Sequence, residues 1–449
     1  MIDVKGKKVL VVGLGISGYA AAELLSLKGA RVRITESEDT AKLRERLEKL
    51  ADYRVRSELG GHTKPFCADA ELVVTSPGVD PGALPLSLAA KKGIPVVGEL
   101  ELGYWFCRAP IIAVTGTNGK STTTEMIGRI ISLSGRHAVV CGNIGNPLSG
   151  EVGELADESI AVVEVSSFQL ETIKRFRPHI AVLLNVSEDH RERHGSYGCY
   201  KAQKFRIFEN QTGEDRAVLH SDFYGDPMTE KIKSQLLFFG SEKKSHTAAK
   251  GFGMSSACSG TGGIVKAEEI PLEGVHNMNN VICSVLVSRI MGIGDRYIRE
   301  GIVTFRGLDH RFEKIGSFGG VEFIDDSKAT NIDATRWALE SVDRKVVLIA
   351  GGRDKGGNYF SILPLAKEKV KAMVLIGEAR EKIKIAFSES IPVLTANDMA
   401  EAVRRACAVA REGEAVVLSP MCSSFDMFSS YKERGEVFQR EVREQFQKI

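Results

Sequence analysis

Short apolar runs alternate with amphipathic stretches along most of the chain. In the first hundred residues, the runs at 7–13, 31–36, 70–79 and 94–99 have the length and composition of strands, whereas 41–51 has the periodicity of a helix. Strands and helices that alternate in this way build a parallel sheet covered by helices. This part of the chain therefore predicts a first α/β domain.

The alternation begins again at "PIIAVTGTNGK" and continues to about Phe305, with a glycine- and serine-rich stretch of unclear pattern near Lys243–Gly263. A third series of strands follows at "KVVLIAGG", "AMVLIGE", "IPVLTA" and "AVVLSP", with helical segments between them. A chain of 449 residues has the length of about three domains. We therefore expect three α/β domains, each on a mainly parallel sheet with flanking helices.

Charge and cysteine content exclude several classes of protein. The 60 Lys and Arg against 58 Asp and Glu give a net charge of +2, without a basic run that would favour nucleic acid. Strand-like "KKVLVVG" begins a few residues after Met1, and no apolar run approaches the roughly 20 residues of a membrane span. The eight cysteines form no C-x-x-C pair. We expect a soluble, cytoplasmic, monomeric protein that neither binds nucleic acid nor inserts into a membrane.

Two glycine-rich turns follow apolar strands, where parallel sheets bind ligands. Gly13, Gly15 and Gly18 have the G-x-G-x-x-G spacing of a dinucleotide site. In the second turn, Gly116–Ser121, backbone N–H groups and a helix N-terminus would surround phosphate oxygens. There Lys120 would neutralise phosphates and Ser121 would bind Mg²⁺, although the spacing is shorter than in the usual phosphate loop and an ordinary strand-to-helix turn is the alternative.

The first turn predicts a Rossmann-like domain at 1–106, and the second predicts a central P-loop ATPase domain at 107–307. The alternation of strands and helices that follows predicts another Rossmann-like domain at 308–449. In the central domain, Glu164 ends an apolar strand, where a carboxylate can complete a magnesium shell. His190 follows another apolar strand and is a further candidate for this site, although a lone histidine at the end of a strand is as often structural.

Six motifs together resemble the Mur ligases of bacterial cell-wall synthesis. They occur in order along the whole chain: "GTNGKSTTT", "EVSSFQLE", "NVSEDHRERHGS", "GLDHRFE", "DDSKATN" and "LSPMCSSFDMF". The segment "SSFDMF" is similar to the branch of the family that adds D-glutamate. The chain has no D-N-P-R segment of the kind found in the branch that adds a diamino acid. Branches that add L-alanine, or glutamates to folate, are the other near alternatives.

The resemblance implies an ATP-dependent amide ligase. Its three domains would hold the UDP-sugar substrate UDP-N-acetylmuramoyl-L-alanine, ATP and D-glutamate, in that order. ATP would convert the substrate carboxylate into an acyl phosphate, and the amine of D-glutamate would then displace phosphate. The first glycine turn would thus bind the pyrophosphate of UDP.

The resemblance also assigns site residues. For the UDP-substrate they are Ile16, Ser17, Glu36, Ser37, Gly78, Asn143 and Ser166. For ATP they are Asn118, Gly119, Lys120, Ser121, Thr122, Asn277, Arg311 and Asp326. For D-glutamate they are Lys328, Thr330, Lys355, Ser424 and Tyr431. Glu36 stands where the family commonly has Asp, and Tyr431 stands where some relatives have Phe.

The same resemblance implies a catalytic set of Lys120, Glu164, His190 and Lys204. Lys204 matches a family lysine that CO₂ carbamylates and that, with His190, approaches a second magnesium ion. The implied metal ligands for two Mg²⁺ ions are therefore Ser121, Glu164, His190 and carbamylated Lys204. From the residues alone, Lys204 is typical of a solvated lysine on a helix face.

Two other classes of function stay open at this stage. The first glycine turn, with Glu36 at the distance of a ribose-binding acid, is also typical of a nicotinamide-dependent oxidoreductase. That interpretation leaves the Lys120 turn and the last two domains unexplained. A catalytically inactive, ligase-like binding protein is disfavoured because Lys120, Glu164, His190 and Lys204 are all present.

Overall fold

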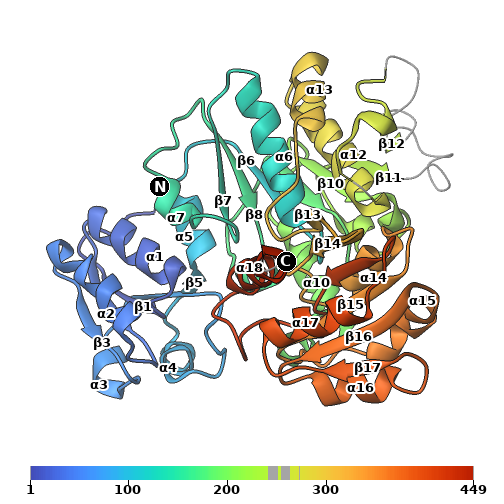
Figure 1. Cartoon of the computed structure of the whole chain (residues 1–449). Coiled ribbons are helices and arrows are strands. Elements are labelled where there is room, and N and C mark those ends of the chain that lie inside the picture. The colour runs from blue at the N-terminus through green and yellow to red at the C-terminus, as the bar shows by residue number, and fades with distance from the viewer. Residues whose placement is uncertain (1, 241–250, 254–262, 273, 448–449) are drawn as a thin grey trace. The chain divides into compact units, whose positions relative to one another are not determined.

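The computed structural model describes residues 2–240, 251–253, 263–272 and 274–447 (Figure 1). Three sheets follow one another along the chain, and this three-part α/β fold confirms the predicted fold class. The chain forms two compact units. The first comprises Met1–Asn185, Lys201–Lys266 and Asn280–Ile302, and the second comprises Val186–Tyr200, Ala267–Asn279 and Val303–Ile449. The domain boundaries predicted from the sequence remain predictions.

The first sheet has the strand order β3-β2-β1-β4-β5, and all of its strands are parallel. The strands are β1 (Lys8–Val12), β2 (Arg31–Thr35), β3 (Arg56–Glu58), β4 (Leu72–Thr75) and β5 (Val96–Gly98). The helices are α1 (Ile16–Leu27), α2 (Ala41–Glu48), α3 (Lys64–Cys67), α4 (Leu84–Lys92) and α5 (Glu99–Phe106). The strand order reverses between β1 and β4, so the carboxyl ends of these strands form the crevice in which such sheets bind ligands.

The second sheet is also parallel, in the order β12-β11-β10-β9-β6-β8-β7. Its strands are β6 (Ile111–Thr115), β7 (Ala138–Gly142), β8 (Ile160–Glu164), β9 (Ile180–Leu183), β10 (Arg216–His220), β11 (Gln235–Gly240) and β12 (Gly251–Gly253). Its part of the chain contains α6 (Lys120–Leu133), α7 (Leu148–Glu151), α8 (Ser167–Leu170), α9 (Arg191–His194), α10 (Tyr197–Phe205), α12 (Val275–Ile290) and α13 (Asp295–Val303). Apart from β12, the glycine- and serine-rich stretch near Lys243–Gly263 lies almost wholly outside the described residues.

The third sheet is mixed, in the order β13-β14-β18-β15-β16-β17. Its strands are β13 (Glu313–Phe318), β14 (Val321–Asp325), β15 (Val346–Gly351), β16 (Val370–Ile376), β17 (Val393–Thr395) and β18 (Ala415–Leu418). Its helices are α14 (Ile332–Glu340), α15 (Leu363–Lys369), α16 (Arg380–Phe387), α17 (Met399–Val409) and α18 (Tyr431–Gln447), with a short 3₁₀ helix at Tyr359–Ile362.

An antiparallel pair, β13 with β14, makes this sheet mixed, and it was not predicted from the sequence. Gly319 and Gly320 join the two strands with φ values of +58° and +75°. A two-residue hairpin turn of this kind needs positive φ at both positions, which glycine adopts without strain. The sequence signal was therefore present in "SFGGVEF".

Alternate residues of the central strands of this sheet pack on opposite faces. Leu348 of β15 and Val417 of β18 belong to one core, whereas Val347 and Val416 belong to the core on the other face. All four side chains are fully buried, and full burial of one such side chain stabilises a fold by about 1.5–3 kcal/mol. Helices on both faces thus hold the sheet and fix the positions of the loops at its carboxyl edge.

Candidate functional site

The first glycine turn links β1 to α1 and leaves space for a ligand. A Cβ atom on Gly18 would lie 1.9 Å from the carbonyl oxygen of Gly13, so this position needs glycine for close packing. A Cβ atom on Gly15 would meet nothing within 4 Å, and Gly15 is also the N-cap of α1. The backbone N–H groups at the start of α1 therefore border open space, as a diphosphate requires.

Glu36 lies beside this turn and is already engaged with it. Its Oε2 accepts a hydrogen bond of 2.7 Å from the backbone N–H of Leu14, and its Oε1 accepts one of 3.0 Å from the hydroxyl of Ser37. Burial opposes the charge of Glu36, but these hydrogen bonds hold its pKa below the usual value. Two other residues assigned to this substrate are accessible: the side chain of Ile16 is 57% exposed, and a Cβ atom on Gly78 would meet nothing within 4 Å.

Two more residues assigned to the UDP-substrate follow β7 and β8. Asn143 Nδ2 donates a 2.7 Å hydrogen bond to Oε1 of Glu164. Ser166 caps α8 through a reciprocal pair of contacts with Gln169. The structure thus brings Asn143 together with Glu164 and gives Ser166 a role in starting a helix.

The second glycine turn links β6 to α6 and is held by a residue from the end of β9. Asn185 Oδ1 accepts a hydrogen bond of 2.9 Å from the backbone N–H of Asn118, and its Nδ2 donates one of 3.0 Å to the carbonyl of Asn118. Beneath the turn, a Cβ atom on Gly119 would lie 2.4 Å from Oδ1 of the buried Asn280. Neither Asn185 nor Asn280 was predicted from the sequence, although Asn185 begins the motif "NVSEDHRERHGS" and Asn280 follows Asn277 by three residues.

Two lysine ammonium groups converge on this turn. Lys120 Nζ donates to the carbonyl oxygens of Gly116 at 2.9 Å and of Thr117 at 2.8 Å. Lys204 belongs to α10 and is only 1% exposed. Its Nζ donates to the same Gly116 oxygen at 2.8 Å. The expectation of a solvated Lys204 from its residue pattern alone is therefore wrong, because its buried ammonium contacts the second glycine turn.

Hydroxyl and carboxylate oxygens, which magnesium prefers, lie next to the lysines. Ser121 and Thr122 lie in the first turn of α6 and are 2% and 6% exposed, while Glu164 ends the neighbouring strand β8 and is 2% exposed. Glu125 lies one helical turn after Ser121, and its burial together with the charge of Glu164 raises its pKa. This donor set fits the chemistry of Mg²⁺, and Glu125 is a carboxylate that the sequence did not single out.

The remaining residues assigned to ATP from the sequence belong to the second compact unit. Asn277 and Arg311 line one cavity of about 360 Å³, together with Arg306 and Lys314. Asp326 accepts a hydrogen bond of 3.2 Å from the backbone N–H of Phe312, which also lines the cavity. Burial raises the pKa of Asp326 to about 7, although a hydrogen bond from Ser419 opposes this.

Residues assigned to D-glutamate lie in the same unit. Lys328 Nζ lies 3.8 Å from the centre of the Tyr431 ring, so these two residues form a cation–π pair. Thr330 follows in the same loop and Ser424 is 2% exposed. The buried Arg434 donates a hydrogen bond of 2.7 Å to the carbonyl of Ser327 and one of 3.2 Å to the carbonyl of Cys422. It therefore links the loop that carries Lys328 to the loop that carries Ser424.

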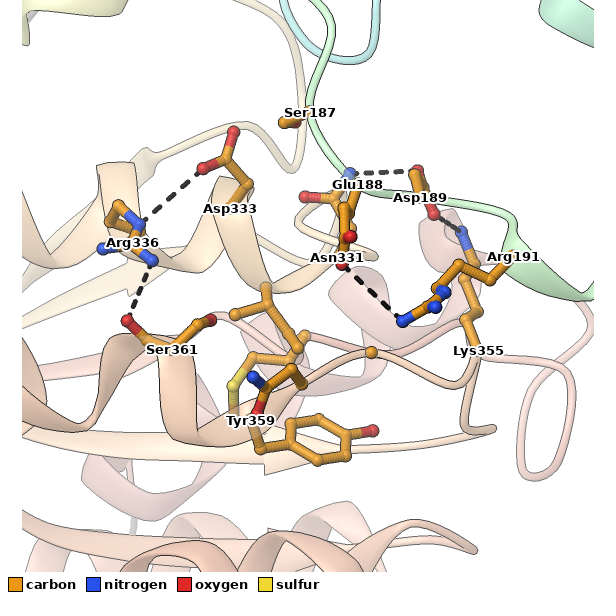
Figure 2. A pocket seen from close by; sticks show the side chains of 14 residues that line it. Ser187, Glu188, Asp189, Arg191, Asn331, Asp333, Arg336, Lys355, Tyr359 and Ser361 are labelled. Carbon is orange, nitrogen blue, oxygen red and sulfur yellow. Dashed lines mark hydrogen bonds and ion pairs between the residues drawn. The ribbon is translucent and has the colours of Figure 1, made fainter. Parts of the chain in front are cut away.

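Lys355 lies elsewhere in this unit, on a cavity of about 240 Å³ (Figure 2). Its Nζ is 3.5 Å from Oδ1 of Asp189, and Asn331 Nδ2 donates to the other carboxylate oxygen at 3.1 Å. Burial opposes the charge of Asp189, but Lys355 and His190 hold its pKa below the usual value. Asp189 is a further residue that was not predicted from the sequence, although it precedes His190 directly.

His190 has a left-handed backbone, with φ of +51°. Its Nε2 lies 3.6 Å from Asp189 and its Nδ1 lies 3.4 Å from Glu192. Burial lowers its pKa to about 4 in spite of these carboxylates. The imidazole is therefore neutral near pH 7, which is the form that binds metal ions.

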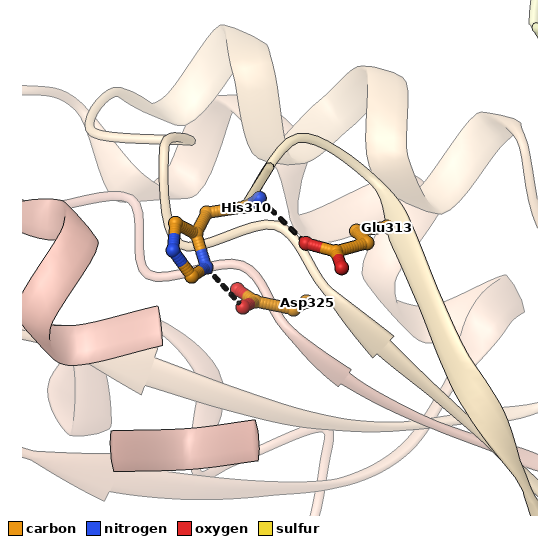
Figure 3. Close-up of side chains that lie close together, drawn as sticks. All are labelled: His310, Glu313 and Asp325. Atoms are coloured by element: carbon orange, nitrogen blue, oxygen red, sulfur yellow. Dashed lines mark hydrogen bonds and ion pairs between the residues drawn. The ribbon is translucent and has the colours of Figure 1, made fainter. Parts of the chain in front are cut away.

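His310, Glu313 and Asp325 form a second cluster of polar side chains, beside β13 and β14 (Figure 3). His310 Nδ1 lies 2.6 Å from Oδ2 of Asp325, and the backbone N–H of His310 donates to Glu313 at 2.8 Å. Gln439 donates to both carboxylates at 2.9 and 3.0 Å. The hydrogen bond to Asp325 raises the pKa of His310. These hydrogen bonds link β13, β14 and α18 (Tyr431–Gln447) to one another.

Family models match three successive stretches of the chain. A Mur ligase MurD-like N-terminal domain matches 7–98, a Mur ligase middle domain matches 114–288 and a Mur ligase glutamate ligase domain matches 310–422. The protein of Desulfosudis oleivorans named UDP-N-acetylmuramoylalanine--D-glutamate ligase is 44% identical over 98% of this chain and 97% of its own. The chain belongs to the Mur ligase family.

Other Mur ligase relatives agree in length and fold. A protein of Koribacter versatilis with the same name is 41% identical, over 98% of each chain. The crystal structure of the MurF ligase of Thermotoga maritima in complex with ADP covers 99% of this chain and 96% of its own, with a TM-score of 0.61 and 17% identity. The UDP-N-acetylmuramate-alanine ligase of the same organism has a TM-score of 0.58 at 19% identity, over 98% of this chain and 99% of its own. These two structures share the fold.

Proposed function

We propose that this protein is an ATP-dependent amide ligase that joins D-glutamate to UDP-N-acetylmuramoyl-L-alanine in the synthesis of peptidoglycan precursors. The observation that carries the proposal is the 44% identity, over 98% of the chain, to a protein named for this reaction. The glycine turn at Gly116–Ser121, with two lysine ammonium groups bonded to it, supports a role in handling ATP.

The proposed reaction has two steps. A carboxylate is a poor acylating agent, so the terminal phosphate of ATP is first transferred to it, which gives an acyl phosphate and ADP. The amine of D-glutamate then attacks the carbonyl carbon, the bond to phosphate breaks, and the amine loses a proton. Both steps gather negative charge, which the cations Lys120, Arg311, Lys328 and Lys355 would stabilise.

The three substrates would use the residues assigned above. The open space at Gly15 suits the diphosphate of UDP, with Ile16, Ser17, Glu36, Ser37, Gly78, Asn143 and Ser166 around the rest of that substrate. ATP would bind at Asn118–Thr122 together with Asn277, Arg311 and Asp326. D-glutamate would bind at Lys328, Thr330, Lys355, Ser424 and Tyr431.

Ser121 and Glu164 would hold one magnesium ion, and His190 with a carbamate on Lys204 would hold a second. Bound there, Mg²⁺ supplies charge neutralisation between phosphate oxygens. The carbamate forms when the Lys204 ammonium loses a proton, the neutral Nζ attacks the carbon of CO₂, and the nitrogen then releases a second proton. Two ammonium groups on one carbonyl oxygen repel each other, and carbamylation replaces one of them with an anion. The remaining N–H can keep its hydrogen bond to Gly116.

The carbamate has a direct spectroscopic test. Enzyme equilibrated with ¹³CO₂ should show a carbamate carbon signal that Lys204→Ala lacks, and removal of CO₂ should lower activity reversibly. Lys201→Ala, which alters a lysine of the same helix that pairs with Asp226, should keep the signal. An unmodified Lys204 in fully active enzyme would end this part of the proposal.

The reaction itself is tested by phosphate release from ATP in the presence of UDP-N-acetylmuramoyl-L-alanine. D-glutamate should support turnover, whereas L-glutamate, L-alanine and diaminopimelate should be slower by about 10³-fold or more, because buried charged groups would be left unpaired. Comparable turnover with L-glutamate would refute the specificity. Calorimetric heat from NAD, with none from the UDP-substrate, would favour an oxidoreductase instead.

Further expectations accompany the proposal. The enzyme would act as a monomer in the cytoplasm, on small-molecule substrates and without nucleic acid or membrane insertion. In the part of the chain that the structure describes, no helix is both long enough and apolar enough to cross a membrane.

A further inference from the structure

Asp189 and Lys355 form a buried ion pair at the wall of a cavity (Figure 2). The two side chains are only 7% and 19% exposed, and Lys355 Nζ lies 3.5 Å from Oδ1 of Asp189. The pair joins two loops that are 166 residues apart in the chain. Removing one partner of a buried pair leaves the other charge uncompensated, which is strongly unfavourable.

The carboxylate of Asp189 is held in place independently of Lys355. Asn331 Nδ2 donates to its Oδ2 at 3.1 Å, and the backbone N–H of His190 donates to its Oδ1 at 2.9 Å. Asn331 is itself fixed as the N-cap of α14, where its side chain accepts from the backbone N–H of Ala334. Asp189 therefore keeps its position when Lys355 turns toward another anion.

We propose that Asp189 binds the ammonium group of the amino-acid substrate, while Lys355 turns from Asp189 to a carboxylate of the same molecule. This inference rests on the proposed ligase function and adds a residue to its amino-acid site. Asp189 contacts the substrate nitrogen while that nitrogen is still an ammonium group. Asp189 thereby sets the position of the nitrogen that later acts as the nucleophile.

The physical reason is charge complementarity with a zwitterion. An amino acid carries an ammonium and a carboxylate a few ångströms apart, so it can enter between Asp189 and Lys355 and give each an opposite charge. A carboxylate ligand without the amine can pair with Lys355 but leaves Asp189 without its cationic partner. The pair therefore selects for amino acids over simple dicarboxylates.

The cavity beside the pair carries charges of both signs, as a zwitterionic ligand requires. Its volume of about 240 Å³ is large enough for a molecule of the size of glutamate, and Arg191 and Arg336 also line it. Arg336 is oriented by a 3.0 Å hydrogen bond to the carbonyl of Ser361 and by Asp333 at 3.7 Å. The carboxylates Glu188 and Asp333 line the cavity as well, and Asp189 is the carboxylate that is buried and paired with Lys355. Asp189 therefore offers an ammonium group a place beside a cation that can bind the carboxylate of the same molecule.

The test compares two ligands that differ only in the amine. In Asp189→Asn, the KM for D-glutamate should rise by about 10- to 100-fold, the effect of losing a charge-assisted contact. The inhibition constant of glutarate, which has both carboxylates and no amine, should stay the same or fall. The KM values for ATP and the UDP-substrate should change by less than about twofold, the level at which a contact is too weak to matter.

Two further variants separate this role from a structural one. Asp226→Asn breaks another Lys–Asp ion pair, with Lys201, at a position that does not line this cavity, and it should leave the KM for D-glutamate and the glutarate constant unchanged. Asp189→Glu keeps the charge and should recover part of the lost affinity for D-glutamate. An equal loss of affinity for D-glutamate and glutarate in Asp189→Asn, or no loss for either, would overturn the proposal.

The wild-type enzyme distinguishes the ligase function from the role of Asp189. Turnover with D-glutamate together with an unchanged KM in Asp189→Asn would leave the ligase function intact and remove the role of Asp189. If the wild type instead uses another amino acid, the KM of that amino acid and the inhibition constant of its deaminated analogue, compared between the wild type and Asp189→Asn, decide the role of Asp189. Turnover with no amino acid at all would overturn both.

Discussion

Asn185 and Asn118 bind each other reciprocally across 67 residues of sequence. The side-chain oxygen of Asn185 accepts from the backbone N–H of Asn118 at 2.9 Å, and its side-chain nitrogen donates to the carbonyl of Asn118 at 3.0 Å. The carbonyl of Asn185 also accepts from the backbone N–H of Thr117 at 3.0 Å. One residue just after β9 thus holds three successive peptide groups of the second glycine turn.

We therefore expect Asn185→Ala to weaken the binding of ATP. The variant loses two hydrogen bonds to a half-buried turn, each with a net worth of about 0.5–1.5 kcal/mol, so the KM for ATP should rise by roughly 5- to 100-fold. The KM for the UDP-substrate should change little. Steady-state kinetics with each substrate varied in turn would show this, and an unchanged KM for ATP would mean that the turn holds its shape without Asn185.

Lys120→Ala should abolish phosphoryl transfer more than binding. Its ammonium is the cation at the start of α6, and loss of a group that stabilises charge on a transferring phosphoryl should lower kcat by about 100-fold or more. Single-turnover formation of the acyl phosphate, trapped by reduction, is the direct measurement. Arg129→Ala on the exposed face of the same helix is the control and should retain wild-type rates. Near-normal acyl phosphate formation in Lys120→Ala would show that this turn does not bind the reacting phosphates.

Two glycines of the first turn should respond differently to substitution, because Gly15 borders the proposed ligand and Gly18 packs against the backbone of Gly13. Gly15 has φ of −64° and open space at its Cβ position, so Gly15→Val should fold normally and raise the KM for the UDP-substrate by about tenfold or more. Gly18→Ala places a Cβ atom 1.9 Å from the carbonyl of Gly13 and should lower the melting temperature instead. Thermal unfolding and kinetics of both variants would check this, and a Gly15→Val enzyme with an unchanged KM would remove the diphosphate from this turn.

Asp326 should make stability depend on pH. Its folded pKa of about 7 lies above the value of 3.8 for an ordinary Asp, so between these two values the folded protein keeps a proton that the unfolded chain has released. Stability should therefore fall as the pH rises from about 4 to about 7. Asn at this position does not titrate, so the stability of Asp326→Asn relative to the wild type should increase across this window by up to about 4 kcal/mol. Parallel stability profiles of the two proteins from thermal unfolding would mean that Asp326 stays charged in the folded protein.

The sequence by itself determined the order of the α/β elements and the two glycine turns. Apolar periodicity is a local property, so β1, β6 and β15 were visible in "KKVLVVG", "PIIAVTG" and "KVVLIAGG". The turns were visible because a positive φ and a close backbone approach demand glycine, as at Gly13 and Gly119. Six motifs in order were enough to indicate the family before any contact was known.

Only the tertiary structure decided which side chains meet. Asn185 with Asn118, Lys204 with Gly116 and Asp189 with Lys355 are pairs separated by 67, 88 and 166 residues. Parallel strands bring their carboxyl ends to one edge of a sheet whatever the length of chain between them, so sequence spacing does not predict these contacts. Burial was equally invisible: Lys204 has the sequence setting of a solvated lysine, yet the packing of α10 leaves it 1% exposed, because exposure depends on what the fold places over a residue.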